Sequence, residues 1–249
     1  MKISIITVVY NNEKTVHTAI ESVLSQSYAN VEYIVIDGKS TDDTLAIINR
    51  YAKSIDTIQS EPDKGIYDAM NKGISLCTGD VIGILNSDDV YADEFVLEKV
   101  MNAFQNDHEL DMVYGDLVYV KADDVDKIVR IWKSTPYYSN FFEDGHVPPH
   151  PSLFIKNTAY KQVGFFNTEM NLAADYDFML RLFKLFGFRS TYLNCLFVKM
   201  RLGGATNASL KNIVYGNLEI LRSWKNNGLK VPFLLMPKRI LKRLIQFLK

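Results

Sequence analysis

Carboxylate side chains follow two of the apolar segments that are expected to form strands. Asp37 closes the segment 33–37, and Asp88 and Asp89 come shortly after the segment 81–85. Neighbouring carboxylates repel each other unless a cation or a hydrogen-bond donor lies beside them. Oxygen ligands completed by water suit Mg²⁺ or Mn²⁺, ions that are often bound through carboxylates together with phosphate groups. The pair therefore predicts a divalent metal site that holds a diphosphate.

A structural role for the same residues is the alternative. Ser87, Asp88 and Asp89 also fit the cap of a helix that would begin near Ala92. Other chemical signatures are missing from the sequence: there is no GxGxxG after the first apolar segment, and no GxxxxGK[ST], HExxH or GxSxG. Hydride transfer, P-loop hydrolysis and zinc hydrolysis are therefore disfavoured.

The elements that would position these carboxylates alternate along the first half of the chain. Short β-branched runs at 3–9, 33–37 and 81–85 are separated by helical patterns, which predicts βαβ units and a mainly parallel sheet. Helices are expected near 16–24 and 67–76, and a third over 45–51 with Ser40 and Asp43 as a capping box. Ligands of open α/β sheets bind at the carboxyl ends of the strands, so the carboxylates are expected to share one site.

The second half has a different pattern. Long apolar runs at 112–120 and 127–132, joined by an acidic turn, predict an antiparallel hairpin. Segment 134–151 is rich in proline and aromatic residues, and a loop of this length is more often functional than idle. A short strand is expected at 152–155, a helix at 175–186, an extended segment at 188–198 and a further helix at 207–224.

Charge is distributed unevenly along the 249 residues. The formal net charge is −1, but residues 1–219 sum to −9 and residues 220–249 to +8. A nucleic-acid-binding protein normally has a positive body, so that class is disfavoured. The two cysteines indicate a reducing compartment. No apolar stretch reaches the roughly 18 residues of a spanning helix, so we expect a cytoplasmic protein.

The C-terminal segment Lys238–Lys249 is amphipathic on a helical wheel, with Lys and Arg on one half and large apolar residues on the other. This pattern is typical of a helix that lies in the plane of an anionic membrane surface. A helix docked on the acidic body, or a dimer contact, is the alternative. The apolar half consists of Ile240, Leu241, Leu244, Ile245, Phe247 and Leu248.

Six ordered segments of the chain form a recognisable set of motifs: Thr7–Glu13, Val35–Thr44, Glu61–Gly73, Leu85–Asp89, His150–Phe154 and Ala174–Arg181. Together they resemble the motifs of family 2 glycosyltransferases. The resemblance covers about residues 1–205 and implies the GT-A fold: an α/β, Rossmann-like, mainly parallel sheet with helices on both faces, a smaller antiparallel acceptor-side region and C-terminal helices. It implies a nucleotide-sugar-binding half at 1–120, an acceptor-side half at 121–205 and a helical extension at 206–249.

The same resemblance implies roles for residues near the nucleotide. Thr7, Val9 and Tyr10 would lie against the base, and Asn11 or Glu13 near the ribose. Thr7 and Val9 fall in the first expected strand, and Tyr10, Asn11 and Glu13 follow it.

Further roles are implied at the other strand ends. Asp37 would accept a hydrogen bond from N3–H of uracil, which favours a UDP-sugar as the donor. Asp88 would face the ribose or sugar, and Asp89 would hold Mn²⁺ or Mg²⁺ on the diphosphate. Asp68 and Asn71 would line the nucleotide pocket, although ordinary helix structure explains them equally well.

The general base that inversion needs on the acceptor hydroxyl is assigned to Asp175. The family acid that precedes it is replaced here by Ala174, and Asp177 would point elsewhere on a helix. His150 would contact the acceptor or a phosphate. The QxxRW motif of processive members is missing, since the nearest tryptophan region is Glu219–Trp224, which indicates addition of a single sugar.

The resulting hypothesis is an inverting, metal-dependent, non-processive glycosyltransferase. It would move one sugar from a nucleotide-sugar to a polyprenyl-diphosphate-linked oligosaccharide of a bacterial surface polysaccharide. It would act at the inner face of the cell membrane, which it would bind through Lys238–Lys249, with no nucleic-acid partner. A non-catalytic nucleotide-sugar-binding partner of an assembly complex is the alternative. A nucleotidyltransferase is disfavoured by the absence of a glycine-rich loop after the first strand.

Overall fold

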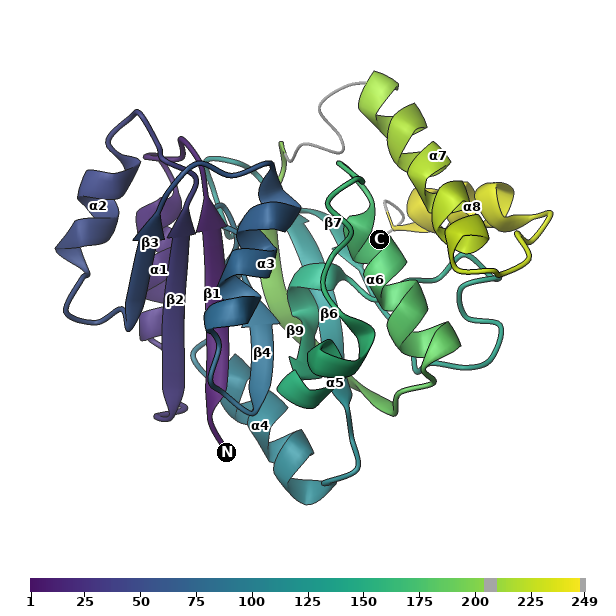
Figure 1. The fold of residues 1–249 in the computed structure, drawn as a ribbon, viewed down its shortest axis with the longest axis horizontal. Coiled ribbons are helices and arrows are strands. Elements are labelled where there is room, and N and C mark those ends of the chain that lie inside the picture. The colour runs from purple at the N-terminus through teal and green to yellow at the C-terminus, as the bar shows by residue number, and fades with distance from the viewer. Residues whose placement is uncertain (204–209, 247–249) are drawn as a thin grey trace.

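The computed structural model describes residues 1–203 and 210–246. A single nine-stranded sheet runs through it in the order β3-β2-β1-β4-β8-β6-β9-β5, with β7 paired to β6 (Figure 1). The strands are β1 Ile3–Val9, β2 Val31–Asp37, β3 Thr57–Ser60, β4 Val81–Ile84, β5 Val90–Tyr91, β6 Met112–Val120, β7 Ile128–Trp132, β8 Leu153–Lys156 and β9 Ser190–Arg201. The helices are α1 Val16–Leu24, α2 Thr44–Arg50, α3 Ile66–Leu76, α4 Val96–Asn106, α5 Asn157–Val163, α6 Ala174–Leu180, α7 Leu210–Asn226 and α8 Leu235–Ile245.

The sheet changes character at β4. Strands β1 to β4 are parallel to one another, with β1 pairing β2 on one side and β4 on the other. Beyond β4 the pairs are antiparallel, except that β6 and β9 run parallel. The predicted α/β class, the parallel first half and the hairpin of β6 with β7 are confirmed. The carboxyl ends of β1, β2 and β4 consequently meet at one edge.

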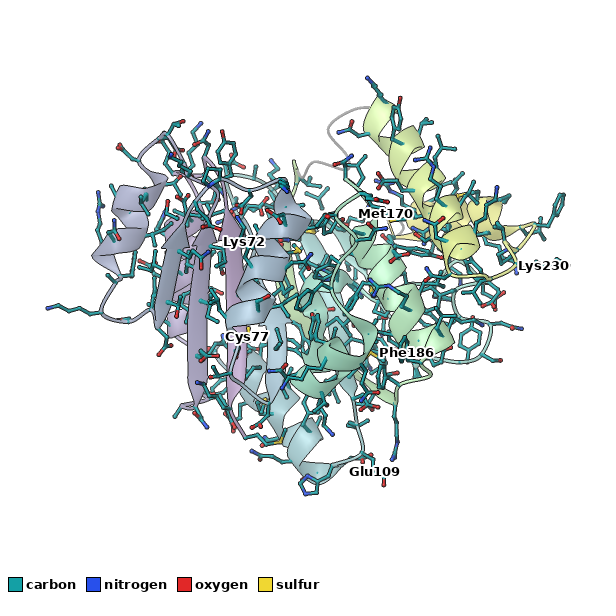
Figure 2. The ribbon with its side chains drawn as sticks, in the orientation of Figure 1. Lys72, Cys77, Glu109, Met170, Phe186 and Lys230 are labelled. Atoms are coloured by element: carbon teal, nitrogen blue, oxygen red, sulfur yellow. The ribbon has the colours of Figure 1, made fainter. Side chains whose placement is uncertain are left out.

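Successive side chains of a buried strand point to opposite faces of the sheet, so a hydrophobic core forms on each face. On β1, Ile6 and Val8 pack with α3 and α6, whereas Ile5 and Val9 pack with α1 and α4. Both faces of the strand are covered, as its unbroken apolar character predicts. Side chains fill the space between the sheet and the helices on each face (Figure 2).

Several local predictions were wrong or incomplete. Ser40 does not cap α2, because its hydroxyl accepts a hydrogen bond from the backbone N–H of Asn11, and the helix begins after Asp43. Segment 90–91 pairs with β9, so α4 begins at Val96 instead of near Ala92. Ser87, Asp88 and Asp89 therefore do not cap it. Strand β3 and helix α5 were not predicted.

The C-terminal helices pack beside α6, at the opposite end of the molecule from α2 (Figure 1). Trp224 of α7 is buried, and its indole N–H donates to the hydroxyl of Tyr176 at 3.0 Å. The predicted boundary at 205/206 and residues 247–249 of the tail lie outside the described residues. Across 1–203 and 210–246, no helix combines the length and apolar character needed to cross a bilayer.

Helix α8 docks on the body through its polar half. Lys238 forms an ion pair with Asp144 at 2.7 Å, and the backbone carbonyl of Gln246 accepts from the N–H of Ile131. A Cβ at Gly145 would lie 2.7 Å from the backbone nitrogen of Arg239, so the loop before β8 touches the helix backbone itself. The alternative of a docked helix is the arrangement observed, and the cations of α8 do not form an outward-facing surface.

Candidate active site

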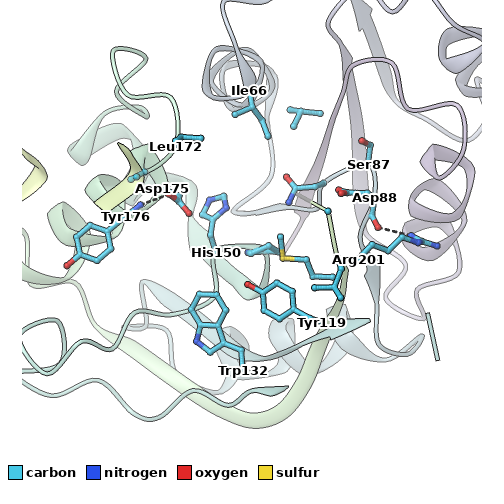
Figure 3. Close-up of a pocket in the computed structure, with 18 of the residues that line it drawn as sticks. Ile66, Ser87, Asp88, Tyr119, Trp132, His150, Leu172, Asp175, Tyr176 and Arg201 are labelled. Atoms are coloured by element: carbon cyan, nitrogen blue, oxygen red, sulfur yellow. Dashed lines mark hydrogen bonds between the residues drawn. The ribbon is translucent and has the colours of Figure 1, made fainter. Parts of the chain in front are cut away.

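A cleft of about 2150 Å³ opens at the carboxyl ends of the parallel strands. One wall comes from the loops after β1, β2 and β4. The opposite wall comes from the segment before β8 and the start of α6, the hairpin of β6 with β7 forms part of the lining, and helices α7 and α8 border the cleft. Figure 3 shows Asp88 on one side and Asp175 on the other, with His150 between them. The cleft thus brings together parts of the chain from the first strand to the last helix.

Asp88 and Asp89 are neighbouring carboxylates in the segment that follows β4. Asp88 is partly exposed and lines the cleft, whereas Asp89 has no exposed surface and does not line it. Burial raises the pKa of Asp88, and burial together with the neighbouring Asp88 raises the pKa of Asp89 well above its ordinary range. Oδ2 of Asp89 accepts from the side-chain amide of Asn86 at 2.9 Å, whereas Oδ1 is buried without a partner among the described residues.

The pair fits a divalent cation in its chemistry. A cation would offset the repulsion between the two carboxylates and satisfy the orphaned Oδ1 of Asp89. In the described part of the chain no three His, Cys, Asp or Glu side chains cluster into a closed metal site. The remaining ligands would have to come from a bound diphosphate and water, as is usual for Mg²⁺. Asn86 supplies a neutral donor where a third carboxylate would add repulsion.

The loop after β1 meets the loop after β2. Tyr10 is 64% exposed and lines the cleft together with Val9 and Asn11. Asn11 adopts a φ of 49°, and its side-chain carbonyl accepts from the N–H of Thr41. The carboxylate of Glu13 accepts from the N–H of Asp43. The side chain of Glu13 therefore joins the two loops.

Two predicted residues lie below the surface of the cleft. Thr7 is buried, and its hydroxyl accepts from the hydroxyl of Tyr33 at 3.0 Å. Asp37 is also fully buried, and its carboxylate accepts from the N–H of Ser40 and the hydroxyl of Ser60. The residue that follows it, Gly38, lines the cleft, and a Cβ there would meet the Asp63 carboxylate at 2.8 Å. Neither predicted side chain lines the cleft.

The predicted residues of α3 are engaged with the protein. Asp68 accepts from the N–H of Lys64 and lies 3.6 Å from Nζ of Lys72, a side chain seen on α3 in Figure 2. The amide of Asn71 forms two hydrogen bonds with the backbone of Phe166. Neither residue lines the cleft, so their side chains fix α3 and the segment before α6. Other residues of the same motif do line it, among them Asp63, Ile66 and Tyr67.

Asp175 lies in the first turn of α6 with its carboxylate in the cleft. Its Oδ1 accepts from the hydroxyl of Tyr67 at 3.2 Å and from the N–H of Tyr176 at 2.8 Å, which orients the group. His150 is buried at the cleft wall and packs edge-on against Phe166, with 5.4 Å between ring centroids. Burial lowers the pKa of His150, although the nearby Asp175 opposes this. The imidazole is thereby favoured in its neutral form.

Helix geometry separates the acidic positions around Asp175. Ala174 has no exposed surface and packs in the core, so an acid there would not have faced the cleft in this structure. Asp177 turns away, as predicted: its carboxylate contacts Arg181 at 3.0 Å and accepts from the side-chain amide of Asn227. Asp175 is the carboxylate of this helix that lines the cleft.

Two residues that hold segments of the cleft in place, Arg201 and Glu219, were not predicted from the sequence. Arg201, at the end of β9, is buried and donates to the backbone carbonyl of Asp88 at 2.7 Å. Glu219 of α7 accepts three backbone N–H groups, those of Asn171, Leu172 and Ala173, at 2.8–2.9 Å. Arg201 lies far from its partner in sequence, and Glu219 is about 46 residues away, so no local pattern could reveal either. Glu219 holds the segment that leads into the turn bearing Asp175.

Removing this carboxylate should loosen the segment. We expect Glu219→Ala to lower the free energy of unfolding by roughly 1–3 kcal/mol, because buried N–H groups lose their acceptor. The melting temperature should fall by roughly 2–12 °C for a chain of this size. Calorimetry measures it, with Glu169→Ala on the exposed segment nearby as the control. An unchanged melting temperature for Glu219→Ala would contradict the role.

The charge of the cleft differs from that of the body. Among the described residues that line it, eight are Lys or Arg and four are Asp. Residues 1–219 are acidic overall. The cleft that they help to enclose nevertheless has more cations than carboxylates, and α8 contributes to this positive charge. An anionic ligand is favoured in such a cleft.

Known proteins match this chain in sequence over most of its length. The model of the family described as glycosyl transferase family 2 matches residues 4–192. The PGL/p-HBAD biosynthesis glycosyltransferase of Mycobacterium bovis is 30% identical over 191 residues, which are 72% of this chain and 69% of that protein.

Solved structures share the fold at low identity. S. aureus TarS 1–349 in complex with UDP-GlcNAc aligns with a TM-score of 0.66 and 19% identity, covering 97% of this chain and 79% of that one. The mannosyltransferase PcManGT from Pyrobaculum calidifontis, in complex with GDP-Man and Mn²⁺, aligns with a TM-score of 0.67 and 13% identity over 97% and 68% of the two chains.

Proposed function

The chain belongs to glycosyl transferase family 2 and has the GT-A fold, and from this premise we propose that it is an inverting, metal-dependent enzyme that adds one sugar to a lipid-linked acceptor. A UDP-sugar is the donor in this proposal, and the acceptor is a polyprenyl-diphosphate-linked oligosaccharide of a bacterial surface polysaccharide. The observation that carries it is the placement of Asp88, which precedes the buried Asp89, and of Asp175 on opposite sides of one cleft (Figure 3).

Asp88 and Asp89 would hold Mn²⁺ or Mg²⁺ with the donor diphosphate. When bound, the ion would stabilise the negative charge that develops on the leaving diphosphate. The buried, unpaired Oδ1 of Asp89 supports this role. Solved relatives of the same fold are bound to UDP-GlcNAc in one case and to GDP-Man with Mn²⁺ in another.

The nucleoside would lie against the loops after β1 and β2. Val9, Tyr10 and Asn11 line this part of the cleft, and Tyr10 is exposed enough to stack on a base. Thr7 and Glu13 would support the loops from behind. The carboxylate of Asp37 already accepts hydrogen bonds from Ser40 and Ser60. Its surroundings would therefore have to change for it to accept a hydrogen bond from N3–H of uracil. Asp68 and Asn71 would shape the nucleotide pocket by fixing α3.

Asp175 would act as the general base. Both hydrogen bonds to its carboxylate end on Oδ1, so Oδ2 would take the proton from the acceptor hydroxyl. Because Asp88 and Asp175 lie on opposite sides of the cleft, the acceptor would attack from the side away from the leaving group, which inverts the anomeric centre. His150, beside Asp175 in Figure 3, would contact the acceptor or a phosphate.

Donor binding provides the direct test of the proposal. A panel of nucleotide-sugars with Mn²⁺ should raise the melting temperature most for UDP-sugars. At 100 times Kd, binding adds about 2.7 kcal/mol to the free energy of unfolding, or roughly 5–10 °C. A larger shift with GDP- or dTDP-sugars would refute the UDP assignment. Binding without turnover on any lipid extract would favour the non-catalytic alternative.

The membrane location is also proposed, with the apolar half of α8 as the contact. The side chains of Leu241 and Leu244 are more than half exposed, and Phe233, just before the helix, is 97% exposed. Exposed large apolar side chains grouped on one helix face are typical of a surface that inserts into an interface. The cations of the helix point the other way, so apolar insertion would dominate over attraction to anionic lipid.

Liposome pelleting tests this location. We expect the wild-type protein to pellet with both zwitterionic and anionic liposomes, and Leu244→Glu to reduce the bound fraction severalfold because a charge enters the interface. Leu24→Glu, at an exposed leucine of α1, is the matched control and should bind as the wild type does. Equal binding of the two variants would place the contact elsewhere.

A further inference from the structure

The polar half of α8 is part of the cleft. Arg239, Lys242, Arg243 and Gln246 line it, and Ile240 and Ile245 of the apolar half also reach its edge. Leu241 and Leu244 do not line it and are exposed. The arrangement is unusual for an amphipathic helix at the edge of a protein, because its charged half faces inward. The charged half therefore presents cations to an anionic group that enters the cleft.

Arg239 is the most deeply placed of these cations. Its guanidinium lies over the ring of Tyr176, 4.7 Å from the centroid, and its Nη1 is buried with no partner among the described residues. Burial lowers the pKa of Arg239, Arg243 adds to this, and Tyr176 and Asp175 oppose it. A buried guanidinium with an unused donor is costly unless an acceptor arrives.

A further cation lines the cleft on the hairpin of β6 with β7. Arg130 of β7 lies over the ring of Tyr119 at 3.7 Å, and burial followed by the nearby Arg243 lowers the pKa of Arg130. Arg243 therefore lies within electrostatic range of both Arg130 and Arg239. Mutually repelling cations gathered in a partly desolvated cleft are stabilised by a bound polyanion.

We propose that Arg239, Lys242 and Arg243 bind the diphosphate of the acceptor lipid. The proposal rests on the proposed function. Arg239 lies against Tyr176, next to the carboxylate that would activate the acceptor, whereas the donor diphosphate belongs with Asp88 and Asp89 on the other side. One helix would thus hold the acceptor headgroup on its charged half while its apolar half lies in the bilayer that contains the lipid chain.

The same anionic chemistry has a second source, the diphosphate of the donor, and a binding experiment separates the two. The probe is farnesyl diphosphate, titrated by calorimetry into the full chain saturated with UDP and Mn²⁺. Lys242→Gln and Arg243→Gln are the test variants. Lys230→Gln is the control, because Lys230 is exposed and lies in the connection between α7 and α8, away from the cleft (Figure 2).

We expect farnesyl diphosphate to bind the UDP-saturated wild type, and each test variant to raise its Kd at least tenfold while the Kd of UDP changes less than twofold. The control should match the wild type, and farnesol, which lacks the phosphates, should bind far more weakly. Competition between farnesyl diphosphate and UDP, or an equal loss of UDP affinity in the variants, would assign the cations to the donor and overturn the proposal.

The titrations distinguish failure of the proposed function from failure of the acceptor site. No UDP binding by the wild type would refute the proposed function, and the titration with farnesyl diphosphate alone would then decide the anion site. UDP binding without any farnesyl diphosphate binding would refute the acceptor site only. Folding of Lys242→Gln and Arg243→Gln is checked by their UDP affinity, which the proposal leaves unchanged.

Discussion

Replacing Asp89 with asparagine is expected to remove most sugar transfer while leaving the protein at least as stable as the wild type without metal. The loss should be roughly 10²–10³-fold in kcat, the scale of losing a preorganised electrostatic contact in a transition state. The Asn86 amide can still donate to the new side-chain carbonyl, so the fold keeps this hydrogen bond.

The gain in stability follows from the direction of the pKa shift. Burial and Asp88 raise the pKa of Asp89 in the folded protein. Ionisation then favours the unfolded state as the pH rises from the ordinary carboxyl range through the raised value. The wild type should therefore lose stability over that interval, and Asp89→Asn should lose less.

Melting temperatures in EDTA at acidic and neutral pH measure this difference. Asp126→Asn is the control, because the exposed Asp126 pairs with Lys199, an interaction that lowers its pKa and gives no reason for a gain. Two results together would refute the role of Asp89. One is a melting temperature of Asp89→Asn well below that of the wild type at neutral pH, and the other is sugar transfer by this variant that still depends on Mn²⁺.

Replacing Asp175 with asparagine should lower kcat by roughly 10²–10⁴-fold, the usual contribution of a general base. The amide is nearly isosteric and can still accept from Tyr67 and from the N–H of Tyr176, so the geometry of the turn should persist. The affinity for UDP should be unchanged, because the nucleoside would bind at the other wall.

Single-turnover transfer and calorimetric titration of UDP separate these two effects. Asp123→Asn is the matched control, since Asp123 is an exposed carboxylate that lines the cleft on the turn between β6 and β7. It should transfer sugar at the wild-type rate. Full activity of Asp175→Asn would sink the assignment of the base.

Elements with strong internal patterns were predictable from the sequence. Strand β1 is apolar at almost every position and α1 repeats apolar residues at helical spacing, so burial by any neighbour suffices to form them. Strand β3 has four residues, of which three are polar, and β5 has two. Such short segments become strands only because β2 and β9 supply hydrogen-bond partners.

The candidate site divides in the same way. Asp88, Asp89 and Asp175 were identified from motifs, because each lies at a strand or helix end whose position follows from local pattern. Glu219 and Arg201 were not, because their partners are brought close by α7 and β9 packing across the sheet. Residues of α3 illustrate the converse: Asp68 and Asn71 match the motif, yet their side chains bond to protein groups outside the cleft.

The sequence by itself determined the family, because its motifs resemble those of the family in type and order, and the α/β class, because local periodicity suffices to define it. It also determined that α8 has a charged half and an apolar half. Only the tertiary structure decided which half meets the body. The orientation of α8 is stabilised by contacts with residues that are distant in sequence, such as Tyr176 beneath Arg239 and Asp144 beside Lys238. The positive cleft inside an acidic body follows from this choice.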